Sequence, residues 1–175
     1  AKFAHGHVGV RPLVRSDAWA IDALRSANID WLSKWDATIP TGAGIPIQTQ
    51  AALIAFQRRK AKAGLMMPFA VTWNGELVGQ ITVNTITRGS ALSASIGYWI
   101  AESHAGRGAT TLAVALVSDH LLVKAGLHRV EIAIRPENAA SLRVVEKLGF
   151  EEVGLARRYL QINGAWRDHR IFQIL

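Results

Sequence analysis

The stretch Glu102-Ser103-His104-Ala105-Gly106-Arg107-Gly108-Ala109-Thr110-Thr111 lies between a strand-like run, residues 95–100, and a helical run, residues 109–125. Its glycines allow a phosphate group to approach the backbone without a Cβ in the way. The first N–H groups of the helix lack partners within it, and the positive end of the helix dipole also favours an anion. Arg107 can pair with phosphate oxygens. The stretch therefore predicts a pyrophosphate-binding loop over residues 107–111.

Two common phosphate-binding loops do not fit this stretch. A P-loop ends in Gly-Lys-Ser/Thr, and the stretch contains no lysine. A dinucleotide-binding loop has a third glycine at the position where this chain has Thr111. On the glycines alone, an ordinary surface turn before a helix is the alternative interpretation.

A second stretch, residues 128–150, reads HRVEIAIRPENAASLRVVEKLGF. Together the two stretches resemble the GNAT family of N-acetyltransferases, in which an R/Q-x-x-G-x-G/A loop binds acetyl-CoA and a later Asn-x-x-Ser/Ala helix ends in Gly-Phe. Ala105 and Thr110 differ from the first and last positions of that loop. Backbone amides bind the pyrophosphate in this family, so the resemblance still implies acetyl-CoA binding. It covers nearly the whole chain and is closest to the RimJ/RimL type of ribosomal-protein acetyltransferase, through residues 158–160 and 166–169.

The composition is that of a globular protein. The 175 residues are 50% hydrophobic, which favours one domain, residues 1–175, with a substantial core. Cysteine is absent, which excludes disulfides and thiol catalysis. No apolar run reaches the length of about 20 residues that spans a membrane, and the first residues form no apolar signal segment. We therefore expect a cytoplasmic protein with no membrane partner.

The chain is basic, with a formal net charge of +7 from 20 Lys and Arg against 13 Asp and Glu. This charge favours polyanionic partners such as the phosphates of CoA, nucleic acid or a ribosome surface. The one basic run, residues 58–62, is typical of a solvated helix face. Because most aromatic residues lie in apolar runs, direct nucleic-acid readout is not expected.

The hydrophobic periodicity and turn signals predict an α/β (α+β) fold, a mixed and mostly antiparallel sheet flanked by helices. The resemblance implies that its central parallel strands, residues 95–100 and 129–134, splay apart and admit the pantetheine arm of CoA. Gly97 predicts a bulge or a close backbone approach in the first of them. Helices are expected at residues 16–27, 31–35, 49–63, 109–125 and 139–148. Strands are expected at residues 7–14, 68–73, 77–84, 92–100, 129–134, 152–161 and 166–175, with hairpin turns at Asn74-Gly75 and Asn163-Gly164.

Direct attack of an amine on acetyl-CoA in a ternary complex needs a base, donors for the oxyanion and a proton for the thiolate. Glu102, just past the end of a central strand, is the candidate base through a water molecule, and a solvated loop glutamate is the alternative. His104 is the second candidate, with a CoA contact or a surface role as its alternative. The resemblance places the Ser141 hydroxyl against the sulfur, whereas helix capping near Asn138 is the local alternative. Many relatives have a tyrosine acid at the position of Val145, so that acid is absent here.

The resemblance also implies ligand-binding residues. Asn138 is expected to contact the pantetheine arm, and a helix N-cap is its structural alternative. Trp31 and Trp35 are expected to line the acceptor cleft, although core packing also explains aromatic residues four positions apart. Tyr159 is a further candidate for the acceptor site. The expected cofactor contacts are Ile100, Glu102, Arg107, Gly108, Ala109, Thr110, Thr111, Asn138 and Ser141.

The sequence thus predicts an acetyl-CoA-dependent N-acetyltransferase that uses no metal. The expected acceptor is the α-amine of a protein N-terminus, and the RimJ/RimL resemblance implies a ribosomal protein. An α-amine has a pKa of about 8, against about 10.4 for lysine, so a weak base suffices. Two alternatives stay open: acetylation of a small-molecule amine (an antibiotic, polyamine or amino acid) and a non-catalytic CoA-binding module. A homodimer also stays open.

Overall fold

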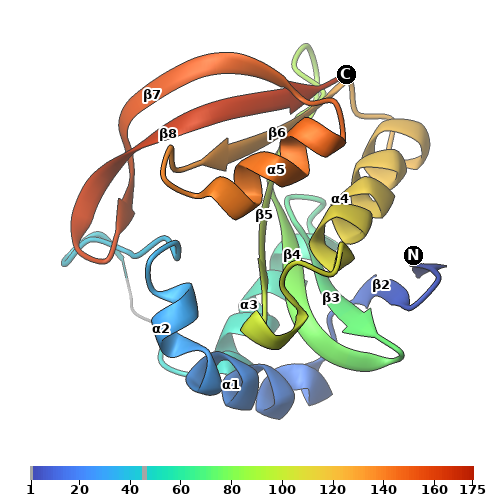
Figure 1. Ribbon diagram of the computed structural model, residues 1–175, viewed down its shortest axis with the longest axis vertical. Helices are drawn as coiled ribbons and strands as arrows, with labels where there is room; N and C mark the ends of the chain where they lie inside the picture. Colours follow the sequence, from blue (N-terminus) through green and yellow to red (C-terminus); the bar gives the residue numbers. More distant parts are fainter. Residues whose placement is uncertain (1, 45–46) are drawn as a thin grey trace.

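The computed structural model describes residues 2–44 and 47–175. Its strands are β1 (Phe3–His5), β2 (Val8–Pro12), β3 (Met67–Trp73), β4 (Glu76–Thr87), β5 (Ser93–Ile100), β6 (Arg129–Ile134), β7 (Glu151–Ile162) and β8 (Ala165–Ile174). They form one eight-stranded sheet in the order β1-β2-β3-β4-β5-β6-β8-β7 (Figure 1). Neighbouring strands are antiparallel except β5 and β6, which are parallel. The predicted mixed, mostly antiparallel sheet is confirmed.

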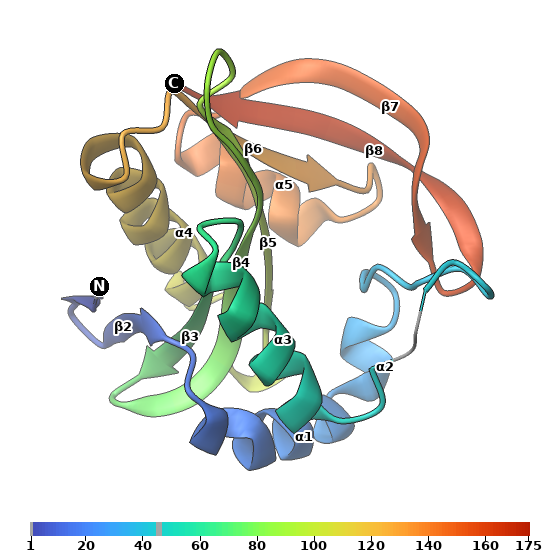
Figure 2. The ribbon, with the colours of Figure 1, turned by 180° about the vertical axis from the view of Figure 1, so that it is seen from behind.

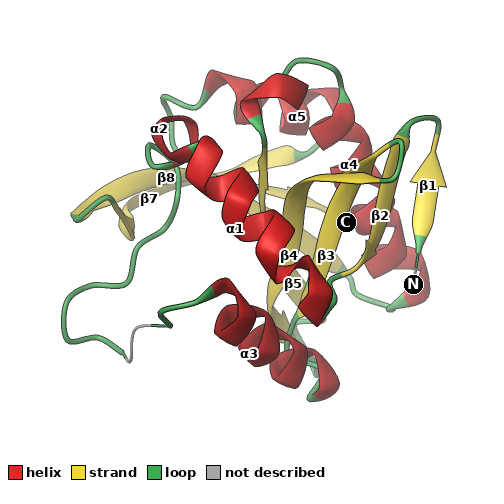
Figure 3. Ribbon diagram, turned by 90° about the horizontal axis from the view of Figure 1, so that it is seen from below, coloured by secondary structure: helices red, strands yellow, loops and turns green. Residues whose placement is uncertain are grey.

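The helices cover both faces of this sheet. They are α1 (Ala18–Ala27), α2 (Ile29–Leu32), α3 (Gln50–Lys62), α4 (Ala109–Asp119), which continues into a π-helical turn (His120–Lys124), and α5 (Ala139–Lys147). Figures 2 and 3 show α1 and α3 on one side of the sheet and α4 and α5 on the other. No helix within the described ranges is long and apolar enough to cross a membrane.

The alternation of side chains along β3 shows why both faces are covered. Phe69 and Val71 pack into the large cluster that includes residues of α4 and α5. Ala70, which points the opposite way, packs with Ile21 of α1 and Ile54 of α3. A strand that is apolar at successive positions can be buried only if both faces of its sheet are covered.

The parallel pair β5–β6 is the feature that opens the sheet. The two strands pair only at Ser93–Arg129, Ala94–Val130 and Ser95–Glu131, although β5 continues to Ile100 and β6 to Ile134. Beyond this register the strands diverge, so the second half of β5 keeps only its antiparallel neighbour β4. The predicted splay of the central strands is confirmed.

Two expectations about the N-terminal third need correction. The sequence prediction missed β1, which pairs with β2 through a turn at Gly6, where φ is 57°. The helix predicted over residues 31–35 is wrong in register, because α2 ends at Leu32. The carbonyl of Leu32 accepts from the N–H groups of both Trp35 and Asp36, so the chain makes a turn there.

The close backbone approach expected at Gly97 occurs at Gly79 instead. Gly97 lies in a regular register opposite Thr82, and a Cβ added there would meet only Asn84 Nδ2, at 3.8 Å. A Cβ on Gly79 would lie 2.3 Å from the carbonyl oxygen of Trp99, which is closer than side chains can approach backbone. Glycine at position 79 therefore lets β4 pair closely with the end of β5.

This difference between the two glycines predicts that the same substitution destabilises the protein far more at position 79 than at position 97. We expect Gly79→Ala to lower the free energy of unfolding by about 2 kcal/mol or more, because backbone cannot move aside as a flexible side chain can. Gly97→Ala, the matched control in the neighbouring strand, should change it by less than about 1 kcal/mol. Urea unfolding followed by circular dichroism measures both, and equal losses would contradict the close approach.

Candidate active site

The loop before α4 has the backbone geometry of an anion site. Gly106 and Gly108 have φ angles of 73° and 79°, in the left-handed region that favours glycine. Gly108 is the N-cap of α4, and no side chain of the described chain caps this helix. The first helical bond joins the N–H of Leu112 to the carbonyl of Gly108, at 3.0 Å. The N–H groups of residues 109–111 therefore have no partner within the helix and can bind an anion.

A cavity of about 440 Å³, here called the loop cavity, opens beside this loop. Arg143 and Lys147 lie on its rim, four residues apart on the exposed side of α5, and give that rim a positive charge. The loop cavity is lined by residues 98–100, 104–106, 108–111 and 137–141, with Trp31, Leu32, Lys34, Trp35, Asp36, Arg143, Val144 and Lys147.

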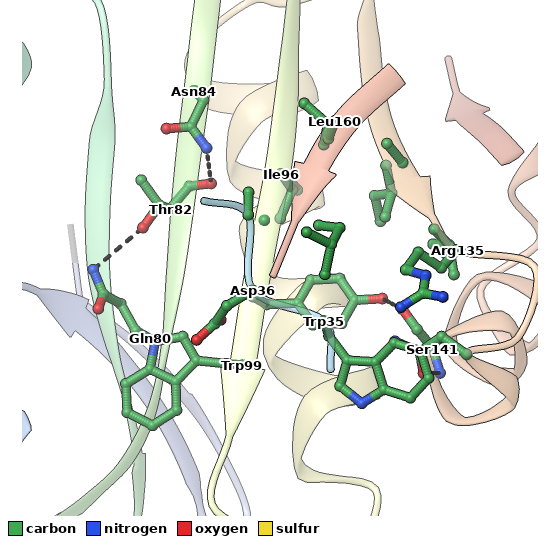
Figure 4. A pocket seen from close by; sticks show the side chains of 18 of the residues that line it. Trp35, Asp36, Gln80, Thr82, Asn84, Ile96, Trp99, Arg135, Ser141 and Leu160 are labelled. Carbon is green, nitrogen blue, oxygen red and sulfur yellow. Dashed lines mark hydrogen bonds between the residues drawn. The ribbon is translucent and has the colours of Figure 1, made fainter. Parts of the chain in front are cut away.

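A second cavity of about 630 Å³, here called the gap cavity, follows the opening between β5 and β6. Figure 4 shows Gln80, Thr82 and Asn84 along one strand, with Arg135 and Ser141 across the cavity from them. Its other lining residues include Arg25, Gln50, Gln57, residues 35–38 and 96–99, residues 132–134, Asn138, Leu160, Ile162 and His169.

The segment after α2 closes the gap cavity against β7. Ala37 forms an isolated antiparallel bridge with Ile162. The N–H of Thr38 donates to the carbonyl of Gln161 at 2.8 Å, and the Thr38 hydroxyl donates to the Gln161 side chain at 3.0 Å. These contacts join the N-terminal third of the chain to its last hairpin.

The two cavities meet at a shared wall. Six residues line both of them: Trp35, Asp36, Tyr98, Trp99, Asn138 and Ser141. A ligand in the loop cavity and a second ligand in the gap cavity would therefore touch each other only at this wall. We infer that the shared wall is the reaction centre.

Two hydroxyl groups at the shared wall are hydrogen-bonded to each other. The phenol oxygen of Tyr98, on β5, lies 2.5 Å from Ser141 Oγ, on α5. Burial raises the pKa of Tyr98 to about 12, and the hydrogen bond with Ser141 lowers it only in part. Tyr98 is therefore a neutral phenol at physiological pH, able to donate and to accept a hydrogen bond.

A single carboxyl group belongs to the wall. Asp36 forms an ion pair with Arg25 of α1, whose guanidinium lies 5.1 Å from the ring centroid of Trp99. Asp36 is the only carboxylate among the described residues that line the gap cavity. Its side chain keeps about a third of its surface exposed, 32%, so it remains open to a further partner.

The chain around α2 is fixed to the sheet by three long-range hydrogen bonds. The Trp31 indole N–H donates to the carbonyl of Ile100 at 3.0 Å. The N–H of Glu102 donates to Asn28 Oδ1 at 2.9 Å. Arg135 donates to the carbonyl of Lys34 at 2.8 Å. These bonds hold Trp31 and the segment after it over the end of β5.

Asn138 caps α5 and also lines the two cavities. Its Oδ1 accepts from the N–H of Ser141 at 3.1 Å, which makes it the N-cap of α5. Because Asn138 lines both cavities, it belongs to the shared wall. The cap thereby positions Ser141 at the start of the helix, beside Tyr98.

The structure brings together most of the residues predicted for the site, but not all. Ile100, Asn138 and Ser141, residues 108–111, Trp31 and Trp35 line the loop cavity. Glu102 and Arg107 are exposed and line neither cavity. Tyr159 is 49% exposed and packs edge-on against His169, 5.9 Å between ring centroids, rather than lining a cavity.

Tyr98, Trp99 and Asp36 were missed by the sequence prediction. Period-2 alternation places Tyr98 on the same face of β5 as Ile100, so strand alternation could have indicated it. Asp36 directly follows Trp35, yet nothing local distinguishes it from a surface aspartate. Among residues 2–44 and 47–175 there is no cluster of three or more His, Asp or Glu side chains that could hold a metal ion.

Comparison with known proteins agrees with this geometry. The model of an acetyltransferase (GNAT) domain matches residues 7–151. This chain belongs to the GNAT family of N-acetyltransferases. Members of this family transfer an acetyl group from acetyl-CoA to an amine.

Three similar proteins show which members of the family this chain resembles. The chain is 33% identical over 168 residues to the probable N-acetyltransferase YjcK of Bacillus subtilis, covering 95% of this chain and 92% of the relative. It is 27% identical to the [ribosomal protein uS5]-alanine N-acetyltransferase of Escherichia coli, covering 91% and 83%. The structure of Mycobacterium smegmatis RimJ in complex with CoA-disulfide superimposes with a TM-score of 0.88 and 38% identity, covering 95% of this chain and 81% of that one.

The charged rim of the loop cavity predicts how CoA is held. We expect calorimetry to show that CoA binds and that dephospho-CoA, which lacks the 3′-phosphate, binds more weakly. The double substitution Arg143→Ala/Lys147→Ala should weaken CoA binding about tenfold, because charge-assisted bonds to a phosphate are lost. It should leave dephospho-CoA binding nearly unchanged.

A control of equal charge separates this local contact from the general positive field. Arg59→Ala/Lys60→Ala removes two exposed basic side chains of α3 that line neither cavity. It should leave the affinity for both nucleotides within about twofold, since exposed distant charges are screened by salt. Equal losses in both double variants would show that α5 makes no specific phosphate contact.

Proposed function

We propose that this N-acetyltransferase acetylates the α-amine of a protein N-terminus and that the gap cavity receives the first residues of that protein. The polar lining of the gap cavity carries the proposal. Five of its side chains are amides, those of Gln50, Gln57, Gln80, Asn84 and Asn138. Amide side chains both donate to and accept from peptide backbone, which suits an extended peptide chain.

The charges of the gap cavity favour a peptide over a polycationic small molecule. Two arginines, Arg25 and Arg135, and one carboxylate, Asp36, are among the described residues that line this cavity. Arg135 is paired with Glu137 at 3.2 Å. Asp36 is already paired with Arg25, so no carboxylate of the described lining is left without a cationic partner. Burial lowers the pKa of His169, so this side chain is neutral at physiological pH. Polyamines and aminoglycosides carry several positive charges, which would need several acidic partners. An N-terminal peptide brings a single ammonium group.

Asp36 is the group we assign to that ammonium. A carboxylate accepts up to about four hydrogen bonds, so the ion pair with Arg25 leaves lone pairs for a second donor. Asp36 lines both cavities, which supports binding of the amine at the junction with the loop cavity. The RimJ-type relatives support a ribosomal protein as the acceptor, because the Escherichia coli relative is named for the alanine N-terminus of ribosomal protein uS5.

The acceptor class is tested with a panel of amines. Acetyl-CoA is offered with peptides that begin with Ala or Ser, N-terminally blocked lysine peptides, spermidine and an aminoglycoside, and the acetyl group is located by mass spectrometry. We expect the product on the α-amine of the unblocked peptides. Preference for a small amine, with no N-terminal product, would replace the proposal by the small-molecule alternative.

Asp36→Asn tests the assignment of the ammonium partner. We expect the acceptor KM to rise about tenfold, because a charge-assisted hydrogen bond is replaced by a neutral one. The affinity for CoA, measured by calorimetry, should stay unchanged. Asp22→Asn removes an exposed carboxylate of α1 that lines neither cavity and serves as the control. An unchanged acceptor KM in Asp36→Asn would contradict the assignment.

Glu102 is retained as the proposed base for the ammonium, acting through solvent because its carboxylate is exposed. Substitution of Glu102 should change the kinetics differently from substitution of Asp36. Glu102→Gln should lower kcat more than it weakens acetyl-CoA binding, since this base acts on the ammonium of the acceptor and not on acetyl-CoA. Unchanged turnover in Glu102→Gln, with activity abolished in His104→Ala, would transfer the role to His104.

A further inference from the structure

The strongest unexplained feature of the shared wall is its pair of hydroxyl groups. Of the six residues that line both cavities, only Tyr98 and Ser141 carry a hydroxyl. Their oxygens are 2.5 Å apart, although the residues lie 43 positions apart in the chain. One member of the pair can face an amine in the gap cavity while the other faces a thioester in the loop cavity.

We propose that Tyr98 and Ser141 form a proton relay that carries a proton from the attacking amine to the departing thiolate. The relay makes Tyr98 a second catalytic residue beside Ser141. It rests on acetyl transfer as the activity and is independent of which amine is the acceptor.

The proton balance of acetyl transfer fits such a relay. The neutral amine forms a bond to the acetyl carbon, and the bond from that carbon to sulfur breaks. The nitrogen must lose one proton and the sulfur must gain one. In the relay the nitrogen gives its proton to the Tyr98 oxygen, Tyr98 gives its own to Ser141 Oγ, and Ser141 gives its own to the thiolate. Both hydroxyls end with a proton, so this step needs no further acid or base once the ammonium has lost its first proton to Glu102 through solvent.

The surroundings of Tyr98 keep the relay ready before the reaction. The tyrosine side chain packs against the large core cluster, which limits its movement. Because burial raises the pKa of the phenol to about 12, its proton is present in the resting enzyme. Ser141 is fixed by the N-cap bond between its own N–H and Asn138. A donor chain that is already oriented needs little reorganisation in the transition state.

A purely structural role is the competing explanation for the pair. The bond joins the first turn of α5 to β5, so it could simply hold the helix against the sheet. This explanation predicts a loss of stability or of CoA binding when either hydroxyl is removed. The relay predicts a loss of the chemical step instead, and the two outcomes are measurable separately.

The test uses Tyr98→Phe, Ser141→Ala and the double variant of the full chain. Single-turnover rates are measured with whichever amine the panel identifies, and the CoA affinity of each variant is measured by calorimetry. We expect each single variant to lose about 100-fold in rate, as is typical of a lost acid–base group. CoA affinity should stay within about twofold. The double variant should be no slower than the slower single variant, because both substitutions break the same chain.

A matched control and an isotope effect complete the design. Ser118→Ala removes a buried hydroxyl on α4 that lines neither cavity and should leave the rate unchanged. The wild-type single-turnover rate should be slower in D₂O than in H₂O. The ratio of the rate in H₂O to the rate in D₂O should be smaller in Tyr98→Phe than in the wild type. An unchanged rate in Tyr98→Phe, additive losses in the double variant, or a loss confined to CoA affinity would each overturn the relay. Failure of N-terminal peptides in the panel would affect only the acceptor class.

Discussion

The divergence of β5 and β6 is the constraint on which the rest of the structure depends. Two parallel strands that separate after Ser95 leave backbone groups and side chains without a neighbouring strand. Buried backbone groups need hydrogen-bond partners, so the opening must be filled by other groups or by a ligand. The indole N–H of Trp31 donates a hydrogen bond to the carbonyl of Ile100. The loop cavity and the gap cavity occupy the rest of the opening.

The opening also explains why distant parts of the chain meet at one wall. The α2 region reaches it from the N-terminal third, Tyr98 from the sheet and Ser141 from α5. The hydrogen bond from Thr38 to Gln161 of β7 holds the segment after α2 along the gap cavity. Two substrates held on either side of one wall gain much of the rate advantage of an intramolecular reaction.

Local signals were enough to predict the framework. The Asn-Gly turns adopt the expected left-handed conformations, with φ of 50° and 89° at residues 74 and 75. The glycine loop and the cap of α5 by Asn138 follow from residue chemistry alone. The bond between Tyr98 and Ser141 and the ion pair of Asp36 depend on tertiary contacts that no periodicity encodes. The position of Glu102 just past the end of a strand predicts a base there. In the fold its N–H bonds to Asn28 at the start of a short turn, and its side chain is exposed to solvent.

The most direct measurement is a crystal structure with a bisubstrate analogue, in which CoA is joined through its sulfur and an acetyl linker to the α-nitrogen of an Ala-initiated peptide. We expect the pyrophosphate on the N–H groups of residues 109–111 and the peptide in the gap cavity. The linking nitrogen should lie next to Tyr98 and the sulfur next to Ser141. A peptide that leaves the loop cavity by another route, with the gap cavity empty, would contradict the two-cavity arrangement.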